Sequence, residues 1–164
     1  MPISQADLRN AANQAGAQTR VAKRADQRTA FLCHSHHDHE LALGLQALLR
    51  QQGLDLYIDW QDSTMPPEPN AETAKQLRRR IMNSEWFLFL ATANSTASRW
   101  CPWELGYADG KMPNEKIVIV PTRDSQKTHG NEYLQLYRTI ETDSVGGLSI
   151  FNPNTKSGYR VSSI

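Results

Sequence analysis

The sequence has little cysteine and almost no net charge. Two of its 164 residues are cysteine, Cys33 and Cys101, which is too few for the disulfide framework of a small secreted domain. Its 18 Lys and Arg against 17 Asp and Glu leave a net charge of +1, so it lacks the strong positive field that non-specific nucleic-acid binding requires. We therefore expect two reduced thiols and no nucleic-acid partner.

The first thirty residues also lack a continuous apolar stretch. Small apolar residues are scattered between Arg and Lys, which is unlike a signal peptide or a membrane span. Residues 1–28 carry only a weak apolar stripe, including Ile3 and Leu8, so we expect a helical or flexible extension outside the core. These features predict a cytoplasmic protein with no membrane segment and one folded domain over 29–164.

Short apolar runs alternate with amphipathic segments along the rest of the chain. The runs expected to form strands are 29–33, 54–59, 86–91 and 116–121. The segments expected to form helices are 35–53, 71–83 and 100–109. Right-handed crossovers fold such a series into an α/β domain with a doubly wound parallel sheet, for which we expect the flavodoxin-like order and four to five strands.

Smaller signals refine this outline. Ser35 and Asp38 have the spacing of a helix capping box, and Gly53 suits a left-handed helix end. Residues 62–70 are Pro-rich and 93–98 are small and polar, so both are expected to be loops. Near the C-terminus we expect a short helix over 132–138 and an edge strand over 148–151.

The segment 98–104 carries the most distinctive chemistry. Trp100 and Glu104 are four residues apart, so on a helix they share one face and place an indole beside a carboxylate, which suits a flat, charged ligand. The alternative is that the indole packs in the core and the carboxylate is a solvated surface charge. In a parallel α/β sheet, ligands bind beyond the carboxyl ends of the strands, where this segment is expected.

Three segments resemble the sequence boxes of bacterial TIR (Toll/interleukin-1 receptor) domains. Residues 31–38 read F-L-C-H-S-H-H-D and resemble F-(I/L)-x-(H/Y)-S-x-x-D, the next strand ends at Asp59, and residues 98–104 read S-R-W-C-P-W-E and resemble S-x-W-C-x-x-E. The boxes follow in the expected order and together cover about residues 29–121.

This resemblance implies an enzyme that cleaves the nicotinamide–ribose bond of NAD+, with Glu104 as the catalytic residue. One carboxylate suffices because nicotinamide already carries a positive charge and leaves without a general acid, unlike the alcohol of an ordinary glycoside. The product is linear ADP-ribose or a cyclic isomer. NAD+ is the substrate, and no separate cofactor is expected. The residues implied to bind it are Trp100, His34, Ser35, Asp38, Asp59, Trp60 and Cys101.

The resemblance extends to the TIR proteins of Thoeris anti-phage systems. It implies self-association through TIR–TIR contacts and a sensor or effector protein acting in trans. One alternative is a non-catalytic interaction module that associates through the Pro-rich loop at 65–69. A more distant one is an enzyme similar to nucleoside deoxyribosyltransferases, which has a comparable sheet and glycosidic chemistry.

A metal site and a basic patch are the remaining alternatives. Four of the five histidines lie within 34–39, but zinc sites usually pair such a cluster with further ligands, and only Cys101 and His129 remain elsewhere. We therefore expect no metal. The run 78–80 of three arginines is interpreted as a solvated helix face.

Overall fold

A computed structural model describes residues 1–16, 28–61, 70–131, 133 and 136–164. Its helices are α1 (Gln5–Ala15), α2 (His39–Gln51), α3 (Ala71–Met82), α4 (Ala93–Ala97) and α5 (Cys101–Lys111). Its strands are β1 (Ile3–Ser4), β2 (Arg28–Cys33), β3 (Leu54–Tyr57), β4 (Trp86–Ala91), β5 (Ile117–Arg123), β6 (Thr128–His129), β7 (Arg138–Thr142), β8 (Leu148–Phe151) and β9 (Gly158–Arg160). Over the described ranges, no helix is long and apolar enough to cross a membrane.

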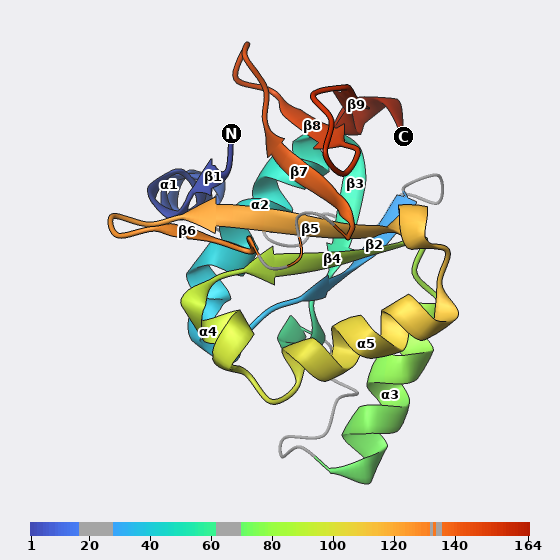
Figure 1. Cartoon of the computed structure of the whole chain (residues 1–164). Helices are drawn as coiled ribbons and strands as arrows, with labels where there is room; N and C mark the ends of the chain where they lie inside the picture. The colour runs from blue at the N-terminus through green and yellow to red at the C-terminus, as the bar shows by residue number, and fades with distance from the viewer. Residues whose placement is uncertain (17–27, 62–69, 132, 134–135) are drawn as a thin grey trace.

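The strands form one mixed sheet in the order β3-β2-β4-β5-β7-β8-β9 (Figure 1). The five strands β3, β2, β4, β5 and β7 are parallel and have the flavodoxin-like order, which confirms the predicted fold class. Over the described residues the sheet has nine strands rather than four to five, because β1 and β6 also pair with β5 and an antiparallel β7-β8-β9 meander extends one side. The prediction that 148–151 is an edge strand is therefore wrong, since β8 lies between β7 and β9.

Alternate residues of the parallel strands face two separate cores. Leu88 and Leu90 of β4 face one core with α1 and α2, whereas Phe87 and Phe89 face the other with α3 and α5. Every residue of β4 is buried, as expected for a strand covered by helices on both faces. Figure 1 shows α3 and α5 together on one side of the sheet and α2 on the other.

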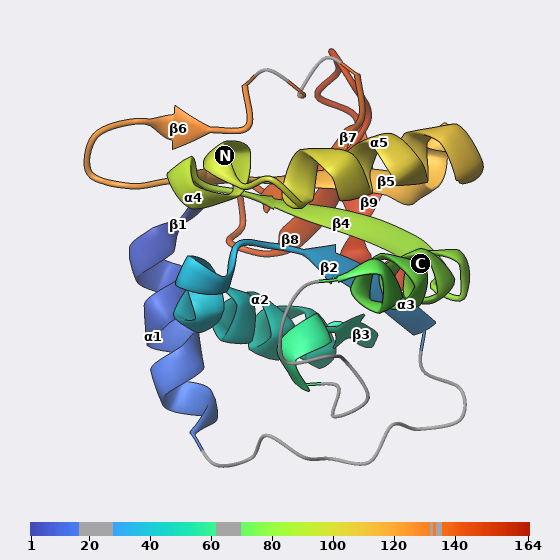
Figure 2. The same cartoon turned by 90° about the horizontal axis from the view of Figure 1, so that it is seen from below.

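The N-terminal segment belongs to the fold. Ile3 and Leu8 are 2% and 0% exposed, β1 pairs with the end of β5, and α1 lies along α2 (Figure 2). The prediction of an extension outside the core is therefore wrong for residues 1–16, although the helix itself is confirmed. Residues 17–27 lie outside the described part of the chain.

Several local predictions also need correction. Residues 93–97 form α4 instead of a loop, because Thr92 and Ser95 make a reciprocal capping box. Of the predicted capping box, the Ser35 half is present, since its side chain caps a short 3-10 helix (His36–Asp38). The Asp38 half is wrong, since Asp38 stands at the N-cap position of α2 without a side-chain cap hydrogen bond. Gly53 has the expected positive φ of 86°. The helix predicted over 132–138 is wrong at Arg138, which begins β7. Residues 132 and 134–135 lie outside the described residues, as does nearly all of the Pro-rich loop, 62–69.

Candidate functional site

The predicted site residues gather at the carboxyl ends of β2 and β3 and at the start of α5. Cys33 ends β2, Asp59 follows β3, and Cys101 begins α5. The strand order reverses between β2 and β4, and ligands of such folds bind at this switch point. The sheet therefore places these residues at the ligand-binding edge of the fold.

Glu104 lies in the first turn of α5 with only 6% of its surface exposed. Burial raises the pKa of its carboxyl group well above the ordinary value, and the charges of Cys101 and Asp59 raise it further, while a hydrogen bond with Cys33 opposes them. No cationic side chain of the described residues acts on it. Glu104 is thus a buried acid that receives no compensating positive charge from the described part of the chain.

The two cysteines pack next to Glu104. The Cys33 thiol donates to the Cys101 carbonyl oxygen at 3.6 Å, and burial raises the pKa of Cys33. Ser98 Oγ accepts from the backbone N–H groups of Trp100 and Cys101 at 3.1 and 3.3 Å, which fixes the start of α5. Cys101 is 1% exposed, so these contacts hold the helix that carries Glu104.

Trp100 is the N-cap residue of α5 and is half-buried. Its carbonyl accepts the backbone N–H of Glu104 at 2.8 Å, which confirms that the two residues are one helical turn apart. Its indole packs edge to face on Trp103, with ring centroids 5.4 Å apart, and Trp103 stacks in turn on Tyr107. Arg78 of α3 lies over Trp103 at 5.3 Å, a contact that the sequence did not reveal.

His34, Asp59 and Trp60 form a second group beside Glu104. The Trp60 indole N–H donates to His34 Nε2 at 3.0 Å, and Asp59 Oδ1 lies 3.9 Å from the same nitrogen. The Trp60 ring also packs on His39, with centroids 4.7 Å apart. Trp60 nevertheless remains 40% exposed, so one aromatic surface is open to a ligand. His39 was not singled out from the sequence, and its contact with Trp60 was missed.

Ser35 and Asp38 are both buried and hold the loops of the site. Ser35 Oγ accepts from the backbone N–H of His37 at 3.3 Å. Asp38 accepts from Thr92 Oγ1 at 2.6 Å and from Asn94 Nδ2 at 2.7 Å, so it ties the start of α2 to α4. Asp38 also lines a cavity of about 280 Å³ next to α1. Contact of either residue with substrate stays a prediction.

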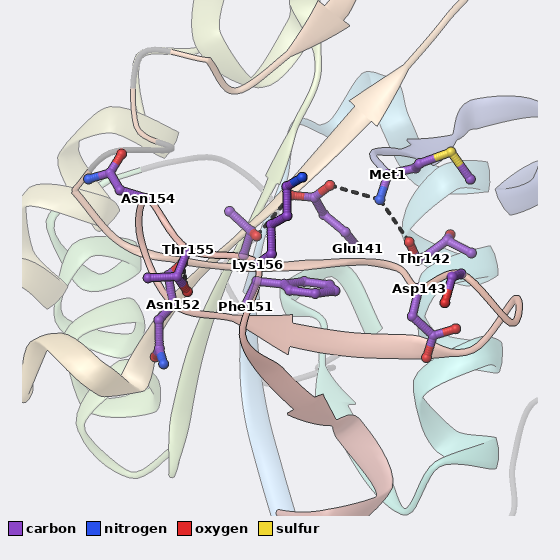
Figure 3. A pocket seen from close by; sticks show the side chains of 11 residues that line it. Met1, Glu141, Thr142, Asp143, Phe151, Asn152, Asn154, Thr155 and Lys156 are labelled. Atoms are coloured by element: carbon purple, nitrogen blue, oxygen red, sulfur yellow. Dashed lines mark hydrogen bonds and ion pairs between the residues drawn. The ribbon is translucent and has the colours of Figure 1, made fainter.

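A larger hollow of about 820 Å³ lies elsewhere, beside the β7–β8 hairpin (Figure 3). The Met1 ammonium at its edge is 3.0 Å from Glu141 and donates to the Thr142 carbonyl at 2.7 Å. Phe151 and Lys156 also line it. None of the predicted site residues borders this hollow, so it is separate from the Glu104 site.

The histidine cluster does not converge on one point. His36, His37 and His39 are exposed, whereas the His34 side chain is 2% exposed and turned toward Trp60. The described part of the chain contains no group of three or more His, Cys, Asp and Glu side chains that could hold a metal ion.

Comparison with known proteins identifies the family of this chain. The profile of the family described as "TIR domain" matches residues 30–146. The chain is also 38% identical over 120 residues to "Probable 3' cyclic ADP-D-ribose synthase ThsB'" of Bacillus cereus (strain MSX-D12). That match covers 70% of this chain and 61% of the relative, so the chain spans less than two thirds of the relative's length. Because the family profile covers well over half of the sequence, with Glu104 and its neighbours inside it, the chain belongs to the TIR domain family.

Proposed function

We propose that this TIR domain cleaves the nicotinamide–ribose bond of NAD+ and that Glu104 is the catalytic carboxylate. The observation that carries the proposal is the burial of Glu104 at the switch point of the sheet, with no cation of the described residues beside it. A buried acid of this kind is costly unless a ligand compensates it, and perturbed acids in clefts are frequent at functional sites.

The chemistry of NAD+ matches this environment. The nicotinamide ring of NAD+ is positively charged, so its arrival beside Glu104 favours the ionised carboxylate that burial disfavours. As the glycosidic bond breaks, its electron pair leaves with neutral nicotinamide and positive charge develops at the anomeric carbon. A fixed carboxylate in a water-poor site stabilises that charge and orients the ribose hydroxyls.

The aromatic side chains would bind the flat parts of the substrate. Trp100 is the N-cap residue of α5, which carries Glu104, and Trp60 directly follows Asp59 after β3. Base-to-indole packing excludes water from the reacting centre and is tolerant of ring type. The seven substrate-binding residues predicted from the sequence are therefore proposed here as contacts of NAD+ or as supports of such contacts.

The Bacillus cereus relative suggests that the product is cyclic. Its name describes a 3' cyclic ADP-D-ribose synthase, and its match covers 70% of the present chain. We propose that this chain also makes a cyclic ADP-ribose signal in anti-phage defence, received by an effector in trans. Self-association is part of the proposal, so activity is expected to rise with protein concentration.

The test is to incubate the purified chain with NAD+ at low and high protein concentration and to separate the products by chromatography. The proposal expects nicotinamide together with a cyclic product, and a loss of both in Glu104→Gln. If no nicotinamide appears at high concentration or with a crowding agent, the chain acts instead as a non-catalytic TIR interaction module.

A further inference from the structure

Asp59 is a second carboxylate of the Glu104 site, and its surroundings differ from those of the other acids there. Its charge contributes to the raised pKa of Glu104, so the two carboxylates lie close enough to interact. The Asp59 side chain is 34% exposed, whereas Glu104 and Asp38 are 6% and 5% exposed. Asp59 is therefore the acid of this group whose side chain reaches solvent.

Asp59 also differs from Asp38 in how many of its carboxylate oxygens already accept hydrogen bonds within the protein. One oxygen of Asp38 accepts from Thr92 and the other from Asn94, so both are engaged within the protein. Asp59 Oδ1 accepts the backbone N–H of Trp60 at 2.9 Å. Since a carboxylate has about four acceptor positions, Asp59 retains capacity for a hydroxyl of a bound ligand.

His34 is the other base in the group, and its nitrogens are occupied. Nε2 accepts the indole N–H of Trp60 at 3.0 Å, and Nδ1 lies 3.3 Å from the Leu32 carbonyl oxygen, to which it donates. To take a proton from a ligand, His34 would first have to release Trp60. Asp59 needs no such rearrangement.

The proposed reaction, on which this inference rests, requires a base in its second step. A cyclic product closed through a 3′ position has a ribose hydroxyl as acceptor. Its oxygen forms a bond to the anomeric carbon after nicotinamide has left with the former bonding electrons, and the hydroxyl proton must then go to a base. Closure through an adenine ring nitrogen would release no proton, and attacking water can lose its proton to bulk solvent.

We propose that Asp59 is the general base for this transfer step. Its carboxylate accepts the proton of the attacking ribose hydroxyl and passes it to water at its exposed edge. Glu104 acts on the first step, in which the nicotinamide–ribose bond breaks, and Asp59 acts on the second, in which the new C–O bond forms. Asp59 thereby sets the ratio of cyclic to linear product.

The two steps can be measured in one reaction with the full chain and NAD+. Nicotinamide reports the first step, and the ratio of cyclic product to ADP-ribose reports the second. For Asp59→Asn we expect the ratio of cyclic product to ADP-ribose to fall by about 100-fold, the lower range for loss of a general base, whatever the rate of nicotinamide release, because the ratio counts only turnovers in which the nicotinamide–ribose bond has already broken. Asp59→Glu, which keeps a carboxylate, restores part of the ratio.

Asp55→Asn is the matched control, because Asp55 lies on β3 and pairs with Arg50 at 3.0 Å. Asp55→Asn is expected to leave the ratio of cyclic product to ADP-ribose unchanged. Continued nicotinamide release shows that each variant is folded, and Asp59→Ser replaces Asp59→Asn if the latter does not fold.

The outcomes separate this inference from the proposed function. A wild-type chain that releases no nicotinamide overturns the proposed function and this inference with it. Two outcomes overturn the role of Asp59 alone. One is nicotinamide release by the wild type without any cyclic product, and the other is an unchanged ratio of cyclic product to ADP-ribose in Asp59→Asn.

Discussion

The Trp60 indole N–H donates to Nε2 of His34 at 3.0 Å, and this contact fixes the tautomer of a buried histidine. An indole N–H is a donor only, so Nε2 must accept and Nδ1 must carry the proton, which it donates to the Leu32 carbonyl. Burial lowers the pKa of His34, although the charge of Asp59 opposes the shift. His34 is therefore neutral when it holds Trp60.

Protonation of His34 is predicted to destabilise the fold in mild acid. Its pKa is lower in the folded than in the unfolded chain, so the unfolded chain binds this proton first as pH falls. The stability linked to neutral His34 is complete above about pH 6.5 and is lost as pH falls through the folded pKa. His34→Gln, which does not titrate, should weaken the decline in urea midpoint between pH 8 and pH 5.

The control is His36→Gln, because His36 is exposed. It should follow the wild type at every pH. An acid decline of the same size in wild type and His34→Gln would contradict the assignment of a buried neutral His34.

Glu104 is predicted to limit stability at neutral and alkaline pH. Its folded pKa is raised above the unfolded value of about 4.3, so stability is complete below that value and is lost as pH rises through the folded pKa. Glu104→Gln has no charge to bury and should be more stable than wild type at pH 8, with the difference shrinking toward pH 4. Urea unfolding at both pH values measures this.

Glu40→Gln is the matched control for this experiment, since the Glu40 side chain is 53% exposed. Both proteins in this comparison keep Glu104, so the stability difference between Glu40→Gln and wild type should change little between pH 4 and pH 8. If Glu104→Gln proves less stable than wild type at pH 8, burial of the ionised Glu104 carboxylate does not destabilise the fold.

Substitution by alanine is predicted to have opposite effects on stability at two helical glycines, one in the contact between α1 and α2 and one on α5. A Cβ at Gly44 of α2 would collide with the Leu8 carbonyl of α1, so Gly44→Ala must separate the helices and should cost roughly 1–3 kcal/mol. Gly106 of α5 has no atom within 4 Å of an added Cβ, so Gly106→Ala should stabilise the chain by up to about 1 kcal/mol through helix propensity. Thermal and urea unfolding measure both; equal stability of Gly44→Ala and wild type would mean that α1 does not pack as described.

The parts of the fold set by local pattern were predictable. The apolar run over 86–91 gives β4 with the expected bounds, and Leu41, Leu45 and Leu49 form the buried face of α2. Long-range pairing was not predictable in the same way. Ile3 and Leu8 form too weak a stripe to show that they join the core, because that depends on β1 pairing with β5, as Ile3 does with Thr122 at a separation of 122 − 3 = 119 positions.

Short elements stabilised by side-chain caps were also missed. Residues 93–97 contain no apolar stripe, and α4 depends on the reciprocal bonds of Thr92 and Ser95. Asp38 had the spacing of a helix cap, but Thr92 and Asn94 approach it from a distant segment and take both its oxygens. Sequence spacing does not reveal such competition between local and distant partners.

In the candidate site, too, local relations were predictable from the sequence and long-range contacts were not. The sequence places Glu104 one turn after Trp100 because that relation is local to α5. The burial of Glu104 and its proximity to Cys33 and Asp59 depend on β2 and β3 meeting α5, which only the folded chain shows. The pattern suggested a solvated surface acid as the alternative, and 6% exposure removes that alternative.

The initial rate of nicotinamide release from NAD+, compared between wild type and Glu104→Gln at equal and high protein concentration, tests the central claim most directly. The substitution keeps the shape of the side chain and removes its charge. We predict that the wild type releases nicotinamide and that Glu104→Gln, with an intact fold by circular dichroism, is slower by about 100-fold or more, as for loss of one preorganised electrostatic group. Release at the wild-type rate by Glu104→Gln would contradict the role of Glu104 as the catalytic carboxylate.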